Sequence, residues 1–105
     1  MDARRHLESL VGQEITTLSG RPNRILRIEG SDVIVATGKS PAGKPVPIGW
    51  VQDAIDMLEA QGEIMIDVET VGYRSAFIGA VLARLPGAVV LSTNPRRVAI
   101  RKPTV

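Results

Sequence analysis

The chain has 105 residues, 44% of them hydrophobic and 23% charged, which is the size of one small globular domain and excludes a multidomain enzyme. No apolar run reaches the roughly 18 to 20 residues that a membrane-spanning helix needs, and the N-terminus lacks a hydrophobic signal core, so we expect a cytoplasmic location and no membrane partner. The formal net charge is +2, and the absence of cysteine excludes disulfides, thiolate zinc sites and a cysteine nucleophile.

The first half of the chain predicts a short helix followed by strands. The helix covers residues 2–11, with Asp2 as its N-cap and Gly12 as its end. Three β-branched runs follow, EITTL, RILRIEG and DVIVATGK, and turn-forming residues separate them, which predicts a three-stranded antiparallel meander. Three prolines and two glycines then occur within the ten residues GKSPAGKPVP, so residues 38–47 predict an ordered loop or a mobile flap.

The period of the pattern changes at Ile48. Residues 48–61 place their apolar side chains on one helix face, and the predicted helix ends at Gly62. Its opposite face is polar and acidic, with Gln52, Asp53, Asp56 and Glu59. The next run, EIMIDVE over residues 63–69, alternates apolar and polar residues and predicts a strand with one buried face.

A second helix is predicted over residues 75–85, with Ser75 as its N-cap and a Pro-Gly pair as its stop. One side of this helix carries only alanine and glycine, including Gly79, which lets the helix backbone approach either a neighbouring strand or a nucleic-acid groove. Two β runs around the turn NPRR then predict a basic hairpin over residues 89–101.

These elements predict a single α+β domain over residues 1–105, with residues 103–105 as the start of a linker. A short N-terminal helix and a three-stranded antiparallel meander come first, and helix, strand, helix and β-hairpin follow. The second half is winged-helix-like in its order, but no helix is predicted between Val68 and Ser75.

Charge is divided sharply along the chain. Residues 45–73 contain six acidic and no basic residues, whereas residues 74–105 contain six basic and no acidic residues. Ten of the thirteen basic residues are arginine, the type suited to bidentate contacts with phosphate and guanine. This division favours a polyanionic partner, and the alternative is that the basic segment pairs in space with the acidic one.

No catalytic motif is present. The sequence contains one histidine, His6, and it lacks the GxSxG elbow, the GxxxxGK[ST] phosphate loop and HExxH. We therefore expect no enzyme activity, no metal and no cofactor. With only three aromatic residues, the chain is also a weak candidate for a single-strand binder that works by base stacking.

Three stretches of the chain carry a family resemblance: LVGQEITTLSGRPNRILRI, VIVATGKSPAGKPVPIGWVQDAIDML and YRSAFIGAVLARLPG. Over nearly the whole chain, and by general pattern rather than by a catalytic motif, it resembles the N-terminal head domain of actinobacterial McrA-type, modification-dependent restriction endonucleases, the ScoMcrA-like group. In that family the head domain resembles a DNA-reading module that precedes other recognition domains and an HNH nuclease. The resemblance implies binding of modified DNA, with 5-methylcytosine as the expected base and with cleavage by a nuclease domain in the same chain or in a partner chain.

The leading hypothesis is a double-stranded DNA-binding module of a restriction system. The helix over residues 75–85 would be the recognition helix and the hairpin over residues 89–101 the wing, with Arg74 beside Tyr73 reading the methylated base and its neighbouring guanine. If Arg74 is structural, the SGRPNR turn and the loop from Lys39 to Lys44 are the next candidates. The candidate DNA-binding residues are Arg21, Asn23, Arg24, Lys39, Ser40, Lys44, Tyr73, Arg74, Ser75, Arg84, Arg96 and Arg97.

The alternative hypothesis is a protein-interaction domain. It would use either the acidic face of the helix over residues 48–61 or an exposed edge strand to bind another chain. Salt distinguishes the two hypotheses, because phosphate contacts weaken steeply as ionic strength rises and an apolar interface does not.

Overall fold

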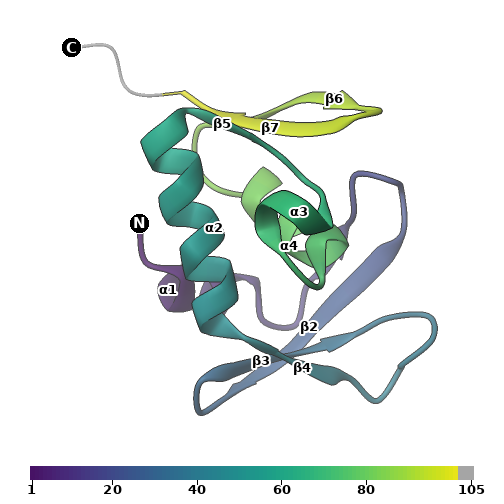
Figure 1. Ribbon diagram of the computed structural model, residues 1–105. Coiled ribbons are helices and arrows are strands. Elements are labelled where there is room, and N and C mark those ends of the chain that lie inside the picture. Colours follow the sequence, from purple (N-terminus) through teal and green to yellow (C-terminus); the bar gives the residue numbers. More distant parts are fainter. Residues whose placement is uncertain (102–105) are drawn as a thin grey trace.

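The computed structural model describes residues 1–101, and within them two antiparallel sheets surround a set of packed helices (Figure 1). The expected linker at residues 103–105 lies outside the described residues. In chain order the elements are α1 (Ala3–Leu10), β1 (Glu14–Thr16), β2 (Pro22–Glu29), β3 (Asp32–Ala36), β4 (Lys44–Pro47), α2 (Ile48–Gln61), β5 (Glu63–Met65), α3 (Val68–Val71), α4 (Ser75–Ala83), β6 (Ala88–Thr93) and β7 (Arg96–Ile100).

The first sheet has four strands in the order β1-β2-β3-β4, all antiparallel, so the predicted three-stranded meander is one strand too short. The additional strand β4 lies in the proline-rich segment that the sequence predicts to be a loop. Prolines are tolerated because β4 is an edge strand and pairs only with β3, and Val46 lies opposite Val33 with both side chains in the core. Only residues 37–43 remain as a loop, and Gly43 (φ 91°) packs where a Cβ would clash with the side chains of Ile34 and Leu26.

The two helix predictions for the first 62 residues are confirmed. The Asp2 carboxylate accepts the N–H of Arg4 at 3.1 Å and caps α1. Helix α2 buries the predicted stripe of Val51, Ile55 and Leu58 and ends at Gly62 in the left-handed conformation.

The second sheet has the strand order β5-β7-β6. The predicted strand over residues 63–69 is wrong beyond Met65, because Asp67 accepts the N–H of Thr70 at 2.7 Å and starts the single-turn helix α3. Helix α4 ends at Ala83, two residues earlier than predicted. The basic hairpin is confirmed as β6 and β7.

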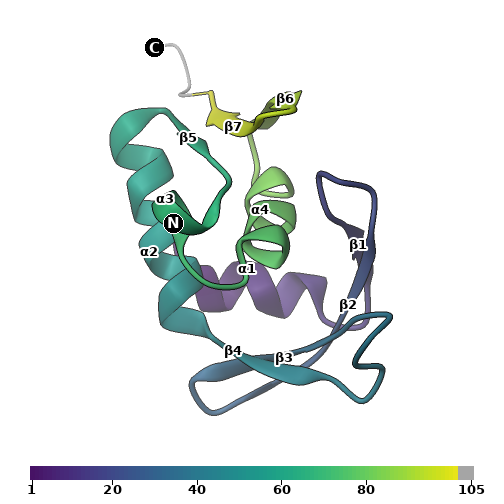
Figure 2. The ribbon, with the colours of Figure 1, turned by 45° about the vertical axis from the view of Figure 1, so that its right-hand side comes forward.

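Helix α4 lies at the centre of the molecule, with α1, α2 and both sheets around it (Figure 2). Seven of its nine residues are buried. Its small-residue side meets protein, since a Cβ on Gly79 would collide with the side chain of Ile66. On another side, Nε2 of His6 on α1 lies 3.1 Å from the carbonyl oxygen of Val81. The close approach that the glycine allows is therefore a packing contact, which is one of the two alternatives that the sequence leaves open.

Candidate functional site

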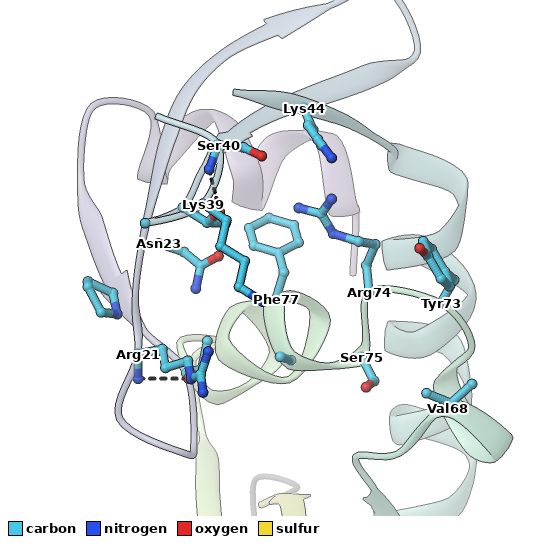
Figure 3. A pocket seen from close by; sticks show the side chains of 15 residues that line it. Arg21, Asn23, Lys39, Ser40, Lys44, Val68, Tyr73, Arg74, Ser75 and Phe77 are labelled. Carbon is cyan, nitrogen blue, oxygen red and sulfur yellow. Dashed lines mark hydrogen bonds between the residues drawn. The ribbon is translucent and has the colours of Figure 1, made fainter. Parts of the chain in front are cut away.

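A pocket of about 700 Å³ opens between the first sheet and the N-terminal end of α4 (Figure 3). Three chain segments form its walls: the turn between β1 and β2, the loop between β3 and β4, and the stretch from α3 into α4. We call it the basic pocket, and its lining residues are Thr17, Arg21, Pro22, Asn23, Thr37, Gly38, Lys39, Ser40, Lys44, Val68, Tyr73, Arg74, Ser75, Ala76 and Phe77.

The lining carries four cationic side chains, Arg21, Lys39, Lys44 and Arg74, and no acidic residue. Within residues 1–101 the ion pairs are Arg27 with Glu29 and the N-terminal amine with Glu59, so no pocket cation has a carboxylate partner within 4.0 Å. In the described part of the chain, the basic C-terminal segment forms no ion pair within 4.0 Å with the acidic segment before it, although β7 pairs with β5 and Arg96 contributes to lowering the pKa of Asp67. Unpaired cations around one concave surface create a positive potential that attracts anions.

The start of α4 adds to this potential. Arg74 precedes the helix in the left-handed conformation (φ 67°, ψ 31°), and the first helical hydrogen bond runs from the N–H of Ile78 to the Arg74 carbonyl at 3.0 Å. The predicted capping role of Ser75 is wrong, because Ser75 is already the first helical residue and no side chain caps the helix. The N–H groups of Ser75, Ala76 and Phe77 therefore have no acceptor within residues 1–101, and they bring the positive end of the helix dipole to the pocket.

Two buried polar side chains of the lining also lack partners. Asn23 is 7% exposed and Ser75 is 8% exposed, and neither side chain makes a hydrogen bond to any part of the chain that the structure describes. Thr17 shows the contrasting case, because its hydroxyl accepts the N–H of Arg21 at 3.0 Å and so holds the turn that carries the Arg21 guanidinium. No fully buried side-chain N or O atom lacks a partner in this described part of the chain, so the polar atoms of Asn23 and Ser75 reach solvent, where they are available to a ligand.

All three aromatic residues of the chain gather at this site. Phe77 forms the back of the pocket and is 2% exposed, whereas Tyr73 stands at the rim and is 72% exposed (Figure 3). Trp50, 41% exposed, packs edge-on against Tyr73 with ring centroids 6.3 Å apart and an interplanar angle of 84°. The scarcity of aromatic residues, which counted against base stacking in the sequence, therefore does not prevent a local stacking surface.

Eight of the twelve candidate DNA-binding residues line the basic pocket. They include Tyr73 and Arg74 together with residues of the SGRPNR turn and of the segment from Lys39 to Lys44. The other four lie elsewhere. Arg24 donates to the carbonyl oxygen of Gly12 at 3.0 Å and lines a smaller hollow beside the first sheet, Arg84 follows the last residue of α4, and Arg96 and Arg97 lie on β7. Sequence reasoning missed Phe77 and Trp50 as site residues, because nothing local distinguishes them from ordinary core positions.

The structure also corrects the role expected of the second helix. A recognition helix needs an open face that can enter the major groove, but α4 is covered by protein along its length and only its first residues reach the pocket. The hairpin of β6 and β7 contributes no residue to the pocket lining.

The acidic face of α2 is partly occupied by the N-terminal segment. Gln52 accepts the N–H of Ala3 at 2.7 Å and donates to the carbonyl oxygen of Met1 at 2.8 Å, and Glu59 pairs with the N-terminal amine at 2.9 Å. The Glu59 hydrogen bond raises the pKa of that amine. This leaves less free surface for the protein-docking alternative than the sequence implies.

Comparisons with protein-family models, with curated proteins and with solved structures found no match to this chain. Within residues 1–101, no helix combines the length and apolar character that crossing a bilayer requires. The same residues contain no group of three or more His, Cys, Asp or Glu side chains placed to hold a metal ion. The function proposed below therefore rests on the geometry and charge of the basic pocket.

Proposed function

We propose that this domain binds double-stranded DNA and that the basic pocket is its principal contact surface. The observation that carries the proposal is that four cations and a helix N-terminus converge on one concave surface, where residues 1–101 supply neither an ion-pair partner nor a cap nor any carboxylate. Each of these groups favours phosphate. Arginine binds phosphate oxygens through two parallel hydrogen bonds, and free N–H groups at a helix N-terminus bind anions directly.

The arrangement of the second half supports a winged-helix-like module. The order α2, β5, α3, α4, β6, β7 contains the short helix between Val68 and Ser75 that the sequence pattern lacks, and the sheet order β5-β7-β6 places the hairpin beside β5. In this proposal the N-terminal end of α4, rather than one of its faces, meets the DNA. Arg96 and Arg97 on the hairpin would contact flanking phosphates.

We further propose that the DNA is modified and that 5-methylcytosine is the recognised base, as the resemblance to the ScoMcrA-like head domain implies. Arg74 lies between Tyr73 and the start of α4 at the pocket, where its guanidinium can bind O6 and N7 of a guanine while the tyrosine ring covers a methyl group. The domain would direct a nuclease domain of the same or a partner chain, and would itself have no catalytic role and no cofactor.

A salt titration of DNA binding tests the proposal. Affinity for a plain duplex should fall tenfold or more between about 50 and 200 mM salt, because each phosphate contact releases condensed counterions. Replacing Arg21, Lys39 or Lys44 with glutamine should each weaken binding and reduce the salt slope by about 1. Arg27→Gln is the matched control, since Arg27 lies on β2 outside the pocket and pairs with Glu29 at 2.8 Å. Salt-independent binding, or an equal loss in the control, would contradict the proposal.

A further inference from the structure

The basic pocket is larger than a phosphate group requires. Its volume of about 700 Å³ falls within the range of roughly 300 to 1,000 Å³ that is typical of pockets for organic ligands. Its cations are also spread around the cavity rather than gathered at one point. In the view of Figure 3, Lys44 and Arg74 lie on one side of the Phe77 ring and Arg21 lies on the other. This spacing leaves room for an uncharged group between two anionic ones.

The interior of the pocket suits a planar, polar-edged ring. Phe77 backs the cavity, and the Asn23 carboxamide, which makes no hydrogen bond within residues 1–101, also lines it (Figure 3). A carboxamide both accepts and donates, and the pairing edge of cytosine offers an N4 amino donor next to the N3 acceptor.

The rim provides a second aromatic surface. Tyr73 is largely exposed and lines the pocket, and its ring packs edge-on against Trp50. Proteins that take a base out of a duplex combine a fitted pocket, aromatic or apolar walls and polar groups that read the base edge. Residues from three separate chain segments bring these features together here.

We infer that the basic pocket holds one cytosine nucleotide turned out of the DNA duplex. Its ring lies on the apolar part of the lining in front of Phe77, its pairing edge contacts Asn23, and its flanking phosphates lie among the four cations. Tyr73 borders the gap through which the nucleotide enters. This inference rests on the proposed DNA-binding function and specifies how the target base is bound.

The test compares two duplexes of the same sequence and charge. One pairs a single 5-methylcytosine with guanine, and the other places the same base opposite an abasic site. Turning the base out requires breaking its pair only in the first duplex, so the second should bind at least tenfold more tightly. Equal affinities with a normal salt slope would overturn the inference and leave the proposed function standing. Absence of salt-dependent binding to either duplex would overturn both.

A pocket-filling variant separates base capture from a general preference for flexible DNA. Ala76 is exposed on α4 and lines the pocket, so Ala76→Leu should occupy the cavity without disturbing the helix. We expect this variant to lose the preference for the abasic duplex and to keep the salt slope. Ala60→Leu, at an exposed position of α2 outside the pocket, is the matched control and should keep the preference. Asn23→Ala should reduce the preference severalfold. A full preference in Ala76→Leu would overturn the inference.

Discussion

Among the non-glycine residues of the described chain, Arg74 alone has a positive φ angle. The left-handed conformation costs an L-residue roughly 1 to 2 kcal/mol, so the surrounding structure must hold it in place. Gly72 (φ 83°) precedes it by two residues, and residues 72–74 form the tight connection from α3 to α4. This connection brings the Arg74 side chain to the basic pocket. Strained residues of this kind occur often at ligand sites, and this agrees with a binding role for Arg74.

Replacing Arg74 separates its contact role from its backbone strain. Arg74→Ala should remove most of the preference for methylated over plain cytosine, because a bidentate contact from arginine to guanine contributes about 1 to 3 kcal/mol of discrimination. Arg74→Gly should lose the same preference. Its free energy of unfolding should be about 1 kcal/mol higher than that of Arg74→Ala, since glycine adopts the left-handed conformation without strain. Competition titrations and urea unfolding measure the two effects.

Arg74→Lys completes that series. Lysine retains the charge but not the planar fork, so the salt slope should stay near that of the unmodified protein while the methylated-to-plain affinity ratio falls. If Arg74→Ala instead keeps the full ratio, the reading residue must be sought among the other pocket side chains, with Asn23 first.

The capping carboxyl of Asp67 should make helix α3 sensitive to acid. Hydrogen bonding by Thr70 lowers the pKa of the Asp67 carboxyl below its usual value of 3.8, with Arg96 as a lesser cause. Because the folded pKa is the lower one, this stabilisation is present above about pH 4 and is lost as the pH falls through the folded value. Asp67→Asn should therefore lose less unfolding free energy than the unmodified protein when the pH is lowered from about 6 to about 3. Equal losses in urea titrations would show that the cap does not contribute.

At the scale of the elements, one glycine in α4 and one in α2 give a matched pair of substitutions. Gly79→Ala should destabilise the fold by about 1 to 3 kcal/mol, because the added Cβ meets the Ile66 side chain in a packed interior. Gly49→Ala should stabilise it by up to about 1 kcal/mol, since Gly49 lies in α2 with open space around it and alanine is the better helix former. Thermal unfolding of both variants measures the difference. A stabilising effect of Gly79→Ala would show that Ile66 relaxes freely.

The elements also show what a sequence can and cannot predict. The Asp2 cap and the α2 stripe are local patterns, and they fold as predicted. Strand β4 is not recognisable, because its prolines argue against a strand unless its edge position is already known. The four residues of α3 are too few for helical periodicity. The alanine-rich side of α4 has the composition of a surface that could face DNA or protein, and only the folded arrangement distinguishes the two.

At the scale of the whole molecule, the charge pattern along the chain predicted cationic segments, but their convergence could not be foreseen. The pocket draws Arg21 from one turn, Lys39 from a loop, Lys44 from the start of β4 and Arg74 from a helix start, and no local rule relates these positions. The sequence did identify each of these residues separately as a candidate. The aromatic part of the site was missed because Phe77 has the spacing of a core residue.

Reversing the charge of the hairpin should separate affinity from selectivity. Arg96→Glu combined with Arg97→Glu should weaken binding of plain and methylated duplexes by the same factor, because phosphate contacts position a protein without reading sequence. The β7 residues lie outside the pocket lining, so the methylated-to-plain ratio should stay unchanged. A variant that lost the ratio alone would place base reading on the hairpin.

The walls of the basic pocket come from residues 17–44 on one side and residues 68–77 on the other, so the site lies on a seam between the two halves of the chain. A bound ligand would contact both halves of the chain and hold them together. Ligand that binds only the folded state at about 100 times its dissociation constant adds about 2.7 kcal/mol to the free energy of unfolding. Amide protons of the β1–β2 turn and of α4, far apart in the sequence, should then exchange with solvent more slowly together when DNA is bound. DNA binding would in this way make the two halves of the domain open and close more cooperatively.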